Sequence, residues 1–133
     1  MINKKINKVA VLGSGIMGSR IACHFANIGV EVLLLDIVPK EGPRNSIVDT
    51  ALQTAVKTNP SPVYSKKVLS KITTGNFEDD MSKIAGFDWI IEVVVENLDI
   101  KKKVFDQVEV MILKQTSADR TFLTRHVTCA CWK

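Results

Sequence analysis

Three glycines near the amino terminus constrain the fold of this chain more than any other feature. They lie in residues 13–18, which read Gly-Ser-Gly-Ile-Met-Gly. The five residues before this run, Lys8–Leu12, are mostly apolar and rich in valine, as in a short buried strand. After it, apolar residues recur at helical spacing from Ile16, and Gly29 supplies a stop. The pattern therefore predicts a strand, a tight glycine turn and an amphipathic helix.

The rest of the chain continues this alternation of strands and helices up to about residue 114. We expect further strands at residues 31–35, 71–74 and 88–95, and helices at 47–56, 65–69, 77–85 and 99–114. Strands that alternate with helices form a parallel sheet with right-handed crossovers. The predicted fold class is α/β, a doubly wound parallel sheet of the Rossmann type.

Length and composition limit the classes of protein that fit. The chain has 133 residues, of which 46% are hydrophobic and 24% charged, enough for the core of one domain. No apolar stretch approaches the ~20 residues of a membrane span, and no apolar block follows the lysine-dotted residues 1–8 as in a secretory signal. A scattered net charge of +4 gives no argument for nucleic acid. Three cysteines form no disulfide framework, so we expect a cytoplasmic, reducing setting.

Each glycine of the turn has a geometric purpose in a dinucleotide site. Gly13 permits the tight turn, Gly15 lets the backbone approach a pyrophosphate, and Gly18 brings the helix against the sheet. The N–H groups at the start of the helix and the positive end of its dipole then face the phosphates. The predicted phosphate-binding residues are Gly13, Ser14, Gly15, Ile16, Met17 and Gly18.

An acidic residue completes this first motif. Asp36 ends the second predicted strand 21 residues after Gly15, close to the ~20 expected for a ribose-binding carboxylate. It would accept hydrogen bonds from ribose hydroxyls and repel a 2′-phosphate, which favours NAD over NADP, although Lys40 and Arg44 are near. On these features alone FAD or another adenosine ligand also fits. The alternative is that the glycines only shape a turn and Asp36 only ends a strand.

A second motif follows the most apolar strand. Residues 92–101 read Glu-Val-Val-Val-Glu-Asn-Leu-Asp-Ile-Lys. Because ligands gather at the carboxyl ends of parallel strands, Glu96, Asn97 and Lys101 would present an acceptor, an amide and a cation to one crevice. A helix cap and a surface ion pair are the structural alternative. Glu92 lies inside the strand and needs a partner if buried, so we expect an edge or interface carboxylate.

Taken together, the two motifs resemble the NAD-binding domain of 3-hydroxyacyl-CoA dehydrogenases. The matching segments are VAVLGSGIMG at 9–18, VLLLD at 32–36, ITTGNFEDD at 72–80 and IEVVVENLDIK at 91–101. The resemblance covers residues 8–114, and its Gly-Ile-Met-Gly and Val-Glu-Asn elements are more specific than a bare dinucleotide fingerprint.

The resemblance implies NAD-dependent oxidation of the 3-hydroxyl of a fatty acyl-CoA, a step of β-oxidation. It implies that the three glycines and Asp36 bind NAD, that Glu96 lies near the nicotinamide-side ribose, and that Lys101 lies between the cofactor and CoA. The family usually forms homo-oligomers through a further domain. Two alternatives remain: a non-catalytic nucleotide-binding module, and another NAD-dependent dehydrogenase acting on hydroxy acids.

No catalytic residue is predicted in this chain. The family's reaction needs a histidine general base held by a glutamate and assisted by a serine and an asparagine, all after the Val-Glu-Asn motif. The two histidines here, His24 and His126, do not match that segment. We therefore expect the chain to bind NAD without turning substrate over.

The pattern of the family fails after residue 114. We divide the chain into an NAD-binding domain at 1–114 and an atypical tail at 115–133, which leaves the sheet incomplete at its carboxyl-terminal end. Residues 121–124 are its only strand-like piece. We hypothesise that the chain is a truncated member of the family whose residues 115–133 come from a shifted reading frame or a mispredicted gene. His126, Cys129 and Cys131 lack the four-ligand spacing of a zinc site, so no metal is predicted.

Overall fold

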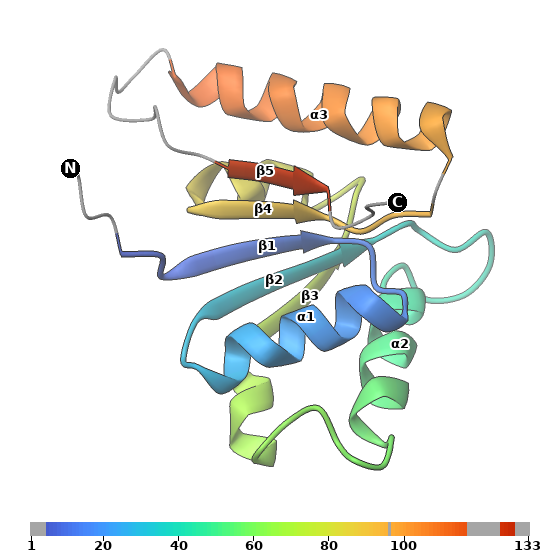
Figure 1. Cartoon of the computed structure of the whole chain (residues 1–133). Coiled ribbons are helices and arrows are strands. Elements are labelled where there is room, and N and C mark those ends of the chain that lie inside the picture. Colours follow the sequence, from blue (N-terminus) through green and yellow to red (C-terminus); the bar gives the residue numbers. More distant parts are fainter. Residues whose placement is uncertain (1–4, 96, 117–125, 130–133) are drawn as a thin grey trace.

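The computed structural model describes residues 5–95, 97–116 and 126–129. Its centre is a parallel sheet of five strands in the order β3-β2-β1-β4-β5 (Figure 1). The strands are β1 (Lys8–Leu12), β2 (Glu31–Asp36), β3 (Ile72–Asn76), β4 (Trp89–Glu92) and β5 (His126–Cys129). Strands β2 and β3 extend the sheet on one side of β1, and β4 and β5 extend it on the other side, with all pairs parallel. This change of side after β3 is that of a doubly wound sheet, which confirms the predicted fold class.

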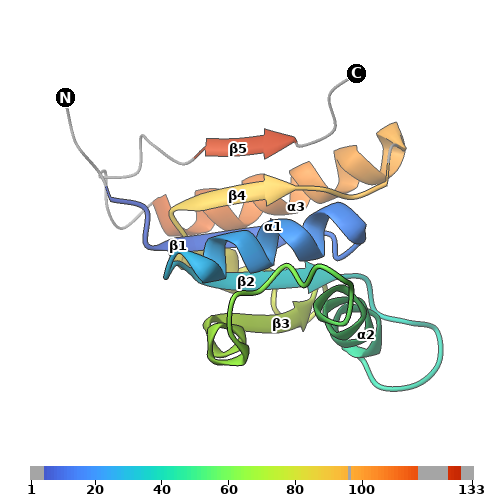
Figure 2. The ribbon, with the colours of Figure 1, turned by 60° about the horizontal axis from the view of Figure 1, so that its bottom comes forward.

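Helices cover the two faces of the sheet. Helices α1 (Ile16–Asn27) and α2 (Ser46–Val56) lie on one face and α3 (Leu98–Thr116) on the other (Figures 1 and 2). Two short 3-10 helices, η1 (Lys66–Lys71) and η2 (Met81–Gly86), flank β3 in the chain. The sheet is therefore the middle of three layers. In such a fold, ligands bind at the loops that follow the carboxyl ends of the strands.

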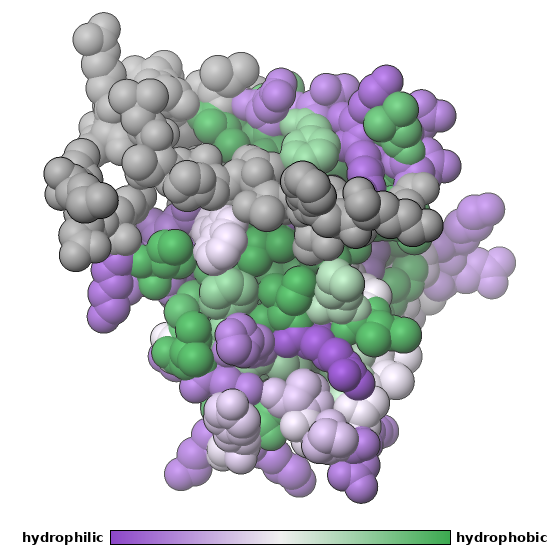
Figure 3. Space-filling view, viewed as in Figure 1, coloured by the Kyte–Doolittle hydropathy of each residue, from purple (hydrophilic) through white to green (hydrophobic). Residues whose placement is uncertain are grey.

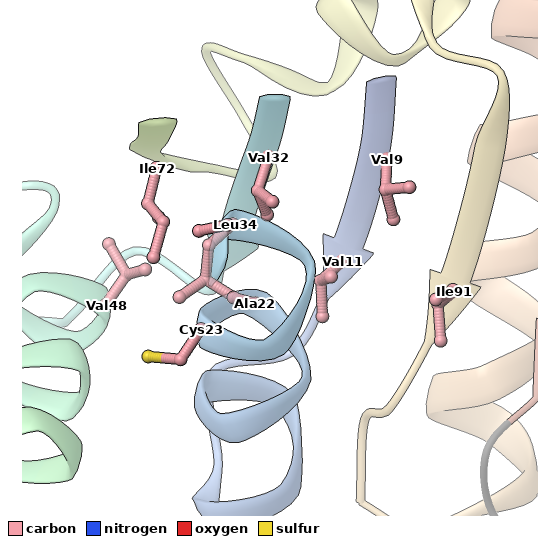
Figure 4. Packing of buried hydrophobic residues seen from close by; sticks show 10 residues of the cluster. Val9, Val11, Ala22, Cys23, Val32, Leu34, Val48, Ile72 and Ile91 are labelled. Atoms are coloured by element: carbon pink, nitrogen blue, oxygen red, sulfur yellow. The ribbon is translucent and has the colours of Figure 1, made fainter. Parts of the chain in front are cut away.

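The core consists of two apolar layers, one on each face of the sheet. Along β1, Val9 and Val11 belong to the layer under α1, whereas Ala10 and Leu12 belong to the layer under α3. All four are fully buried, because side chains of a strand alternate between the two covered faces. Figure 4 shows the α1 layer, which includes Cys23; burial raises the pKa of its thiol.

Two predicted elements differ from the structure by three residues or more at one end. The strand predicted at 88–95 ends at Glu92, because the Glu92 carboxylate accepts the N–H of Val94 and the backbone leaves the ladder. The helix predicted at 77–85 is replaced by a turn and η2, because the Asp80 carboxylate accepts the N–H of Asn76 and holds the chain in that turn. Local side-chain bonds thus compete with regular structure.

The strand β5 is not predicted by the sequence pattern. It pairs with β4 in parallel, with Trp89 opposite His126 and Glu92 opposite Cys129. The piece at 121–124 that the sequence favours as a strand lies outside the described residues. Within the part of the chain that the structure describes, no helix has both the length and the apolar character to cross a bilayer.

Candidate cofactor-binding site

The glycine turn lies at the edge of the sheet where β1, β2 and β4 end (Figure 1). Backbone bonds hold it against both neighbouring strands. Gly13 donates its N–H to the Leu35 carbonyl of β2 at 2.8 Å, and Val93, just after β4, donates to the Leu12 carbonyl at 2.8 Å. The first predicted motif and the start of the second are therefore in contact.

Two of the glycines are required by close approach of the backbone. Gly13 has a φ of +112°, and a Cβ there would lie 2.7 Å from the Val93 carbonyl oxygen. A Cβ at Gly18 would lie 1.9 Å from the carbonyl oxygen of Gly13. Any side chain at Gly18 would push α1 away from the turn, so this glycine sets how closely the helix packs.

Gly15 has a different environment, because a Cβ there would meet none of the described atoms within 4 Å. It caps α1 without a side-chain hydrogen bond, and the first turn of the helix contains no acidic residue. The first N–H groups of a helix have no partner within it, and the dipole favours negative charge there. Because the turn has open space at Gly15 and N–H groups without a partner in the helix, it fits a phosphate.

Asp36 lies beside the turn, as its spacing predicts. Its Oδ2 accepts the backbone N–H of Ser14 at 2.7 Å and also the Ser14 hydroxyl, while its Oδ1 accepts the N–H of Ile37 at 2.7 Å. A carboxylate offers about four acceptor positions, so Asp36 keeps one for a ligand hydroxyl. The residues present therefore fit an adenosine ribose next to a diphosphate.

The sequence predicts a role for the backbone N–H of Ser14 but not for its hydroxyl, which bonds Asp36. Ser14 is buried, and its carbonyl oxygen accepts the hydroxyl of the equally buried Ser19 at 2.7 Å. Together the two serines link the first turn of α1 to Asp36. A serine between two glycines, facing an acid on the next strand, is the only signal in the sequence for this link.

Two hollows flank the start of α1. One, of about 440 Å³, opens between α1 and α2 and has a partly polar lining: Ser14, Gly15, Ile16, Ser19, Arg20, Ala51, Thr54, Ala55 and Thr58. The other, of about 720 Å³, is more apolar and is lined by Ile16, Met17, Arg20, Ile21, His24, Phe25, Trp89 and Ile91. Figure 3 shows apolar surface gathered across the middle of the face viewed there. Serine and threonine line only the first hollow, so that hollow suits a phosphate better.

Arg44, one of the two nearby basic residues, is engaged elsewhere. Its guanidinium donates to Asp79 Oδ2 at 2.7 Å and to Glu78 Oε2 at 2.8 Å. These bonds raise the pKa of Arg44, and the bond from Arg44 lowers the pKa of the Asp79 carboxyl. Because its charge is already paired with two acids, Arg44 is a poor partner for a 2′-phosphate, which favours NAD.

In the second motif, Glu92 and Lys101 come together. Glu92 is fully buried between β1 and β5, and its Oε2 lies 3.9 Å from Nζ of Lys101. The expectation of an edge or interface carboxylate is therefore wrong, because the glutamate stands on an interior strand. Asn97 is a helix cap whose Oδ1 accepts the N–H of Asp99 at 3.0 Å. Glu96 lies outside the described residues.

No described histidine lies at this edge. His24 is exposed in the second half of α1, with its ring edge-on to Phe25 at a centroid distance of 5.9 Å. Among the described residues no group of three or more His, Cys, Asp or Glu side chains could hold a metal ion. Cys131, part of the cluster considered from sequence, lies outside them.

The strand, glycine turn and helix, with an acid at the end of the next strand, define a dinucleotide-binding domain of the Rossmann class. Residues 8–118 match the family model described as "3-hydroxyacyl-CoA dehydrogenase, NAD binding domain". The chain belongs to this family, and the resemblance seen in its sequence is confirmed.

Named relatives agree with this assignment. A probable 3-hydroxyacyl-CoA dehydrogenase of Bacillus subtilis is 50% identical over 123 residues, covering 81% of this chain and 16% of the relative. One of Deinococcus radiodurans is 40% identical over 111 residues, covering 83% of this chain and 32% of the relative. The chain thus spans less than a third of the length of either relative.

Solved structures agree on the fold. The dehydrogenase part of multifunctional enzyme 1 from Caenorhabditis elegans superposes with a TM-score of 0.67 at 20% identity, covering 98% of this chain and 27% of that one. The 3-hydroxybutyryl-CoA dehydrogenase of Escherichia coli K12 gives 0.56 at 26% identity, covering 81% and 23%.

Proposed function

We propose that this chain binds NAD as the cofactor half of a 3-hydroxyacyl-CoA dehydrogenase, with the diphosphate over the turn between β1 and α1. The observation that carries the proposal is the junction of Asp36 with this turn: the ribose-binding acid bonds the N–H of Ser14 at 2.7 Å. Turn and acid therefore act as one unit. NAD itself supplies the hydride acceptor; the protein binds and orients it.

Separate groups of the predicted residues bind separate parts of the ligands in this proposal. N–H groups of residues 15–18 bind the diphosphate, and the remaining acceptor position of Asp36 takes a hydroxyl of the adenosine ribose. Glu96 contacts the nicotinamide-side ribose. Lys101 lies between the cofactor and the CoA of an acyl-CoA substrate.

The substrate class follows from the family and from the names of its members. Besides the two relatives above, a putative fatty acid oxidation complex trifunctional enzyme of Rickettsia felis is 41% identical over 108 residues. We infer that the reaction served by this domain is oxidation of the 3-hydroxyl of a fatty acyl-CoA.

Catalysis needs a base that removes the hydroxyl proton during oxidation, and the same group, in its protonated form, returns that proton to the substrate oxygen in the reverse reduction by NADH. His24, exposed on α1 against Phe25, is no candidate. We therefore expect this chain to bind NADH but to give no turnover with acetoacetyl-CoA and NADH. An absorbance assay of NADH at saturating substrate measures this, and activity above that of a buffer blank would show that the chain contains a base.

Replacing the acid tests the site directly. In Asp36→Ala the bonds to the ribose and to Ser14 are lost, so we expect the Kd for NADH, measured by titration calorimetry, to rise about ten- to a hundredfold. Asp106→Ala, the same change at an exposed position of α3, is the matched control and should leave the Kd unchanged. Equal affinities of the Asp36 variant and the wild type would refute the proposed site.

A further inference from the structure

Glu92 is an unusual residue in this fold. Among the residues whose burial the structure describes, it is the only charged side chain in the buried class, with 0% of its surface exposed. It ends β4, between β1 and β5, on the face that carries α3. A charge without solvent is costly unless it is paired and hydrogen-bonded, so the position calls for a reason.

The two carboxylate oxygens of Glu92 face different parts of the site. Oε1 accepts the N–H of Val94 at 2.7 Å, which fixes the backbone where it leaves β4. This backbone lies directly on the glycine turn, since the carbonyl of Val93 occupies the space of a Cβ at Gly13. One oxygen thus supports the wall of the diphosphate turn.

The other oxygen, Oε2, faces Lys101. It has no hydrogen-bond partner among the described residues, and the Lys101 ammonium lies 3.9 Å away. The Lys101 side chain is only 16% exposed, although it stands on the first turn of α3 beside exposed Lys102 and Lys103. The start of α3 and the glycine turn lie at the same edge of the sheet (Figure 1). The buried acid therefore faces one lysine of the three at this edge.

We propose that Glu92 is a positioning residue for the cofactor site: its buried carboxylate fixes the Lys101 ammonium at the edge where NAD binds. The inference rests on the proposed function, and it assigns to Glu92 an effect on cofactor affinity that is exerted through Lys101. A long lysine side chain loses much rotamer freedom when it is fixed, and the carboxylate imposes this order before the ligand arrives.

Glu92→Gln isolates the charge. The amide oxygen can still accept the Val94 N–H, but its NH₂ group then faces the Lys101 ammonium, donor against donor, and the attraction between the two side chains is lost. We expect the Kd for NADH, measured by calorimetry, to rise about three- to tenfold, as in Lys101→Met, and the double variant to bind no more weakly than either single one.

Three comparisons make the test decisive. Glu31→Gln removes the acid of the exposed Lys8–Glu31 pair (3.6 Å) at the opposite edge of the sheet and should not change the Kd. A purely structural role would lower the urea midpoint of Glu92→Gln and leave the Kd of the folded protein at the wild-type value, which would overturn the proposal. If the increase in Kd of the double variant equals the product of the two single increases, Glu92 and Lys101 act independently, and this would also overturn the proposal.

If Glu92→Gln fails to fold, Glu92→Asp takes its place, because it keeps the charge but withdraws it from Lys101. The same rise in Kd is expected, and an unchanged Kd overturns the proposal. Suppose that the wild-type chain binds NADH, that Asp36→Ala weakens this binding, and that the Glu92 variants have the wild-type Kd. Only the positioning role of Glu92 then fails. If the folded wild-type chain binds no NADH, the proposed function fails together with it.

Discussion

At the scale of single residues, the glycines of the turn differ in how much space their surroundings leave for a side chain. Gly18 and Gly15 are three positions apart in one turn, yet a Cβ at Gly18 would lie 1.9 Å from a backbone oxygen, whereas one at Gly15 would meet no described atom within 4 Å. Packing therefore explains Gly18, whereas the surroundings of Gly15 are open, as the proposed diphosphate site requires. The two glycines should respond differently to the same substitution.

We expect Gly18→Ala to lower the free energy of unfolding by about 2–3 kcal/mol, because the clash is with backbone and α1 must shift. Gly15→Ala should lower it by no more than about 1 kcal/mol, since its φ of −57° suits alanine. The latter should instead weaken NADH binding about tenfold, because the methyl group enters the space of the diphosphate. Urea unfolding and calorimetry separate the two; a stable Gly18→Ala protein would contradict the steric role.

Some residue-level features could be predicted from sequence, and others could not. The positions of Asp36 and of the glycines follow from the spacing of one strand, one turn and one helix. The bond from the Ser14 hydroxyl to Asp36 and the pairing of Glu92 with Lys101 depend on tertiary placement. A buried glutamate and an edge glutamate have the same sequence pattern, so burial of Glu92 was not predictable.

At the scale of elements, the apolar pattern of the sequence predicts those helices and strands that pack into the core. The strands β1 and β2 and the helix α3 lie within two residues of their predicted bounds, because each has a strong apolar pattern. β4 is shorter than predicted and η2 replaces a helix, because the side chains of Glu92 and Asp80 bond nearby N–H groups. β5 has no marked pattern of its own, and its pairing with β4 alone defines it.

Two valines on α3 test which face of this helix is packed. Val108 is 1% exposed against the sheet, whereas Val110 is 46% exposed. Val108→Ala should cost about 1–3 kcal/mol of unfolding free energy, and Val110→Ala less than about 0.5 kcal/mol. Denaturant unfolding measures both. Equal costs would contradict the burial of Val108 and the exposure of Val110, and would mean that α3 is rotated about its axis.

At the scale of the whole molecule, the doubly wound topology brings distant segments to one edge. The glycine turn, Asp36 and the start of α3 are separated by up to about 85 residues in sequence, yet all lie at the carboxyl ends of β1, β2 and β4. The described part of the chain thereby presents a glycine turn, an acid and a paired lysine without a histidine among them. The molecule is organised for cofactor binding.

Mapping of backbone amides by NMR tests this organisation most directly. On titration of the ¹⁵N-labelled chain with NADH, the account predicts the largest shifts at residues 13–18, Ile37 and 97–101, with little change at the opposite edge, at Lys8 and Glu31. Saturation should follow a single binding curve. A folded protein whose amides do not respond to NADH, or respond chiefly at the opposite edge, would contradict the central claim.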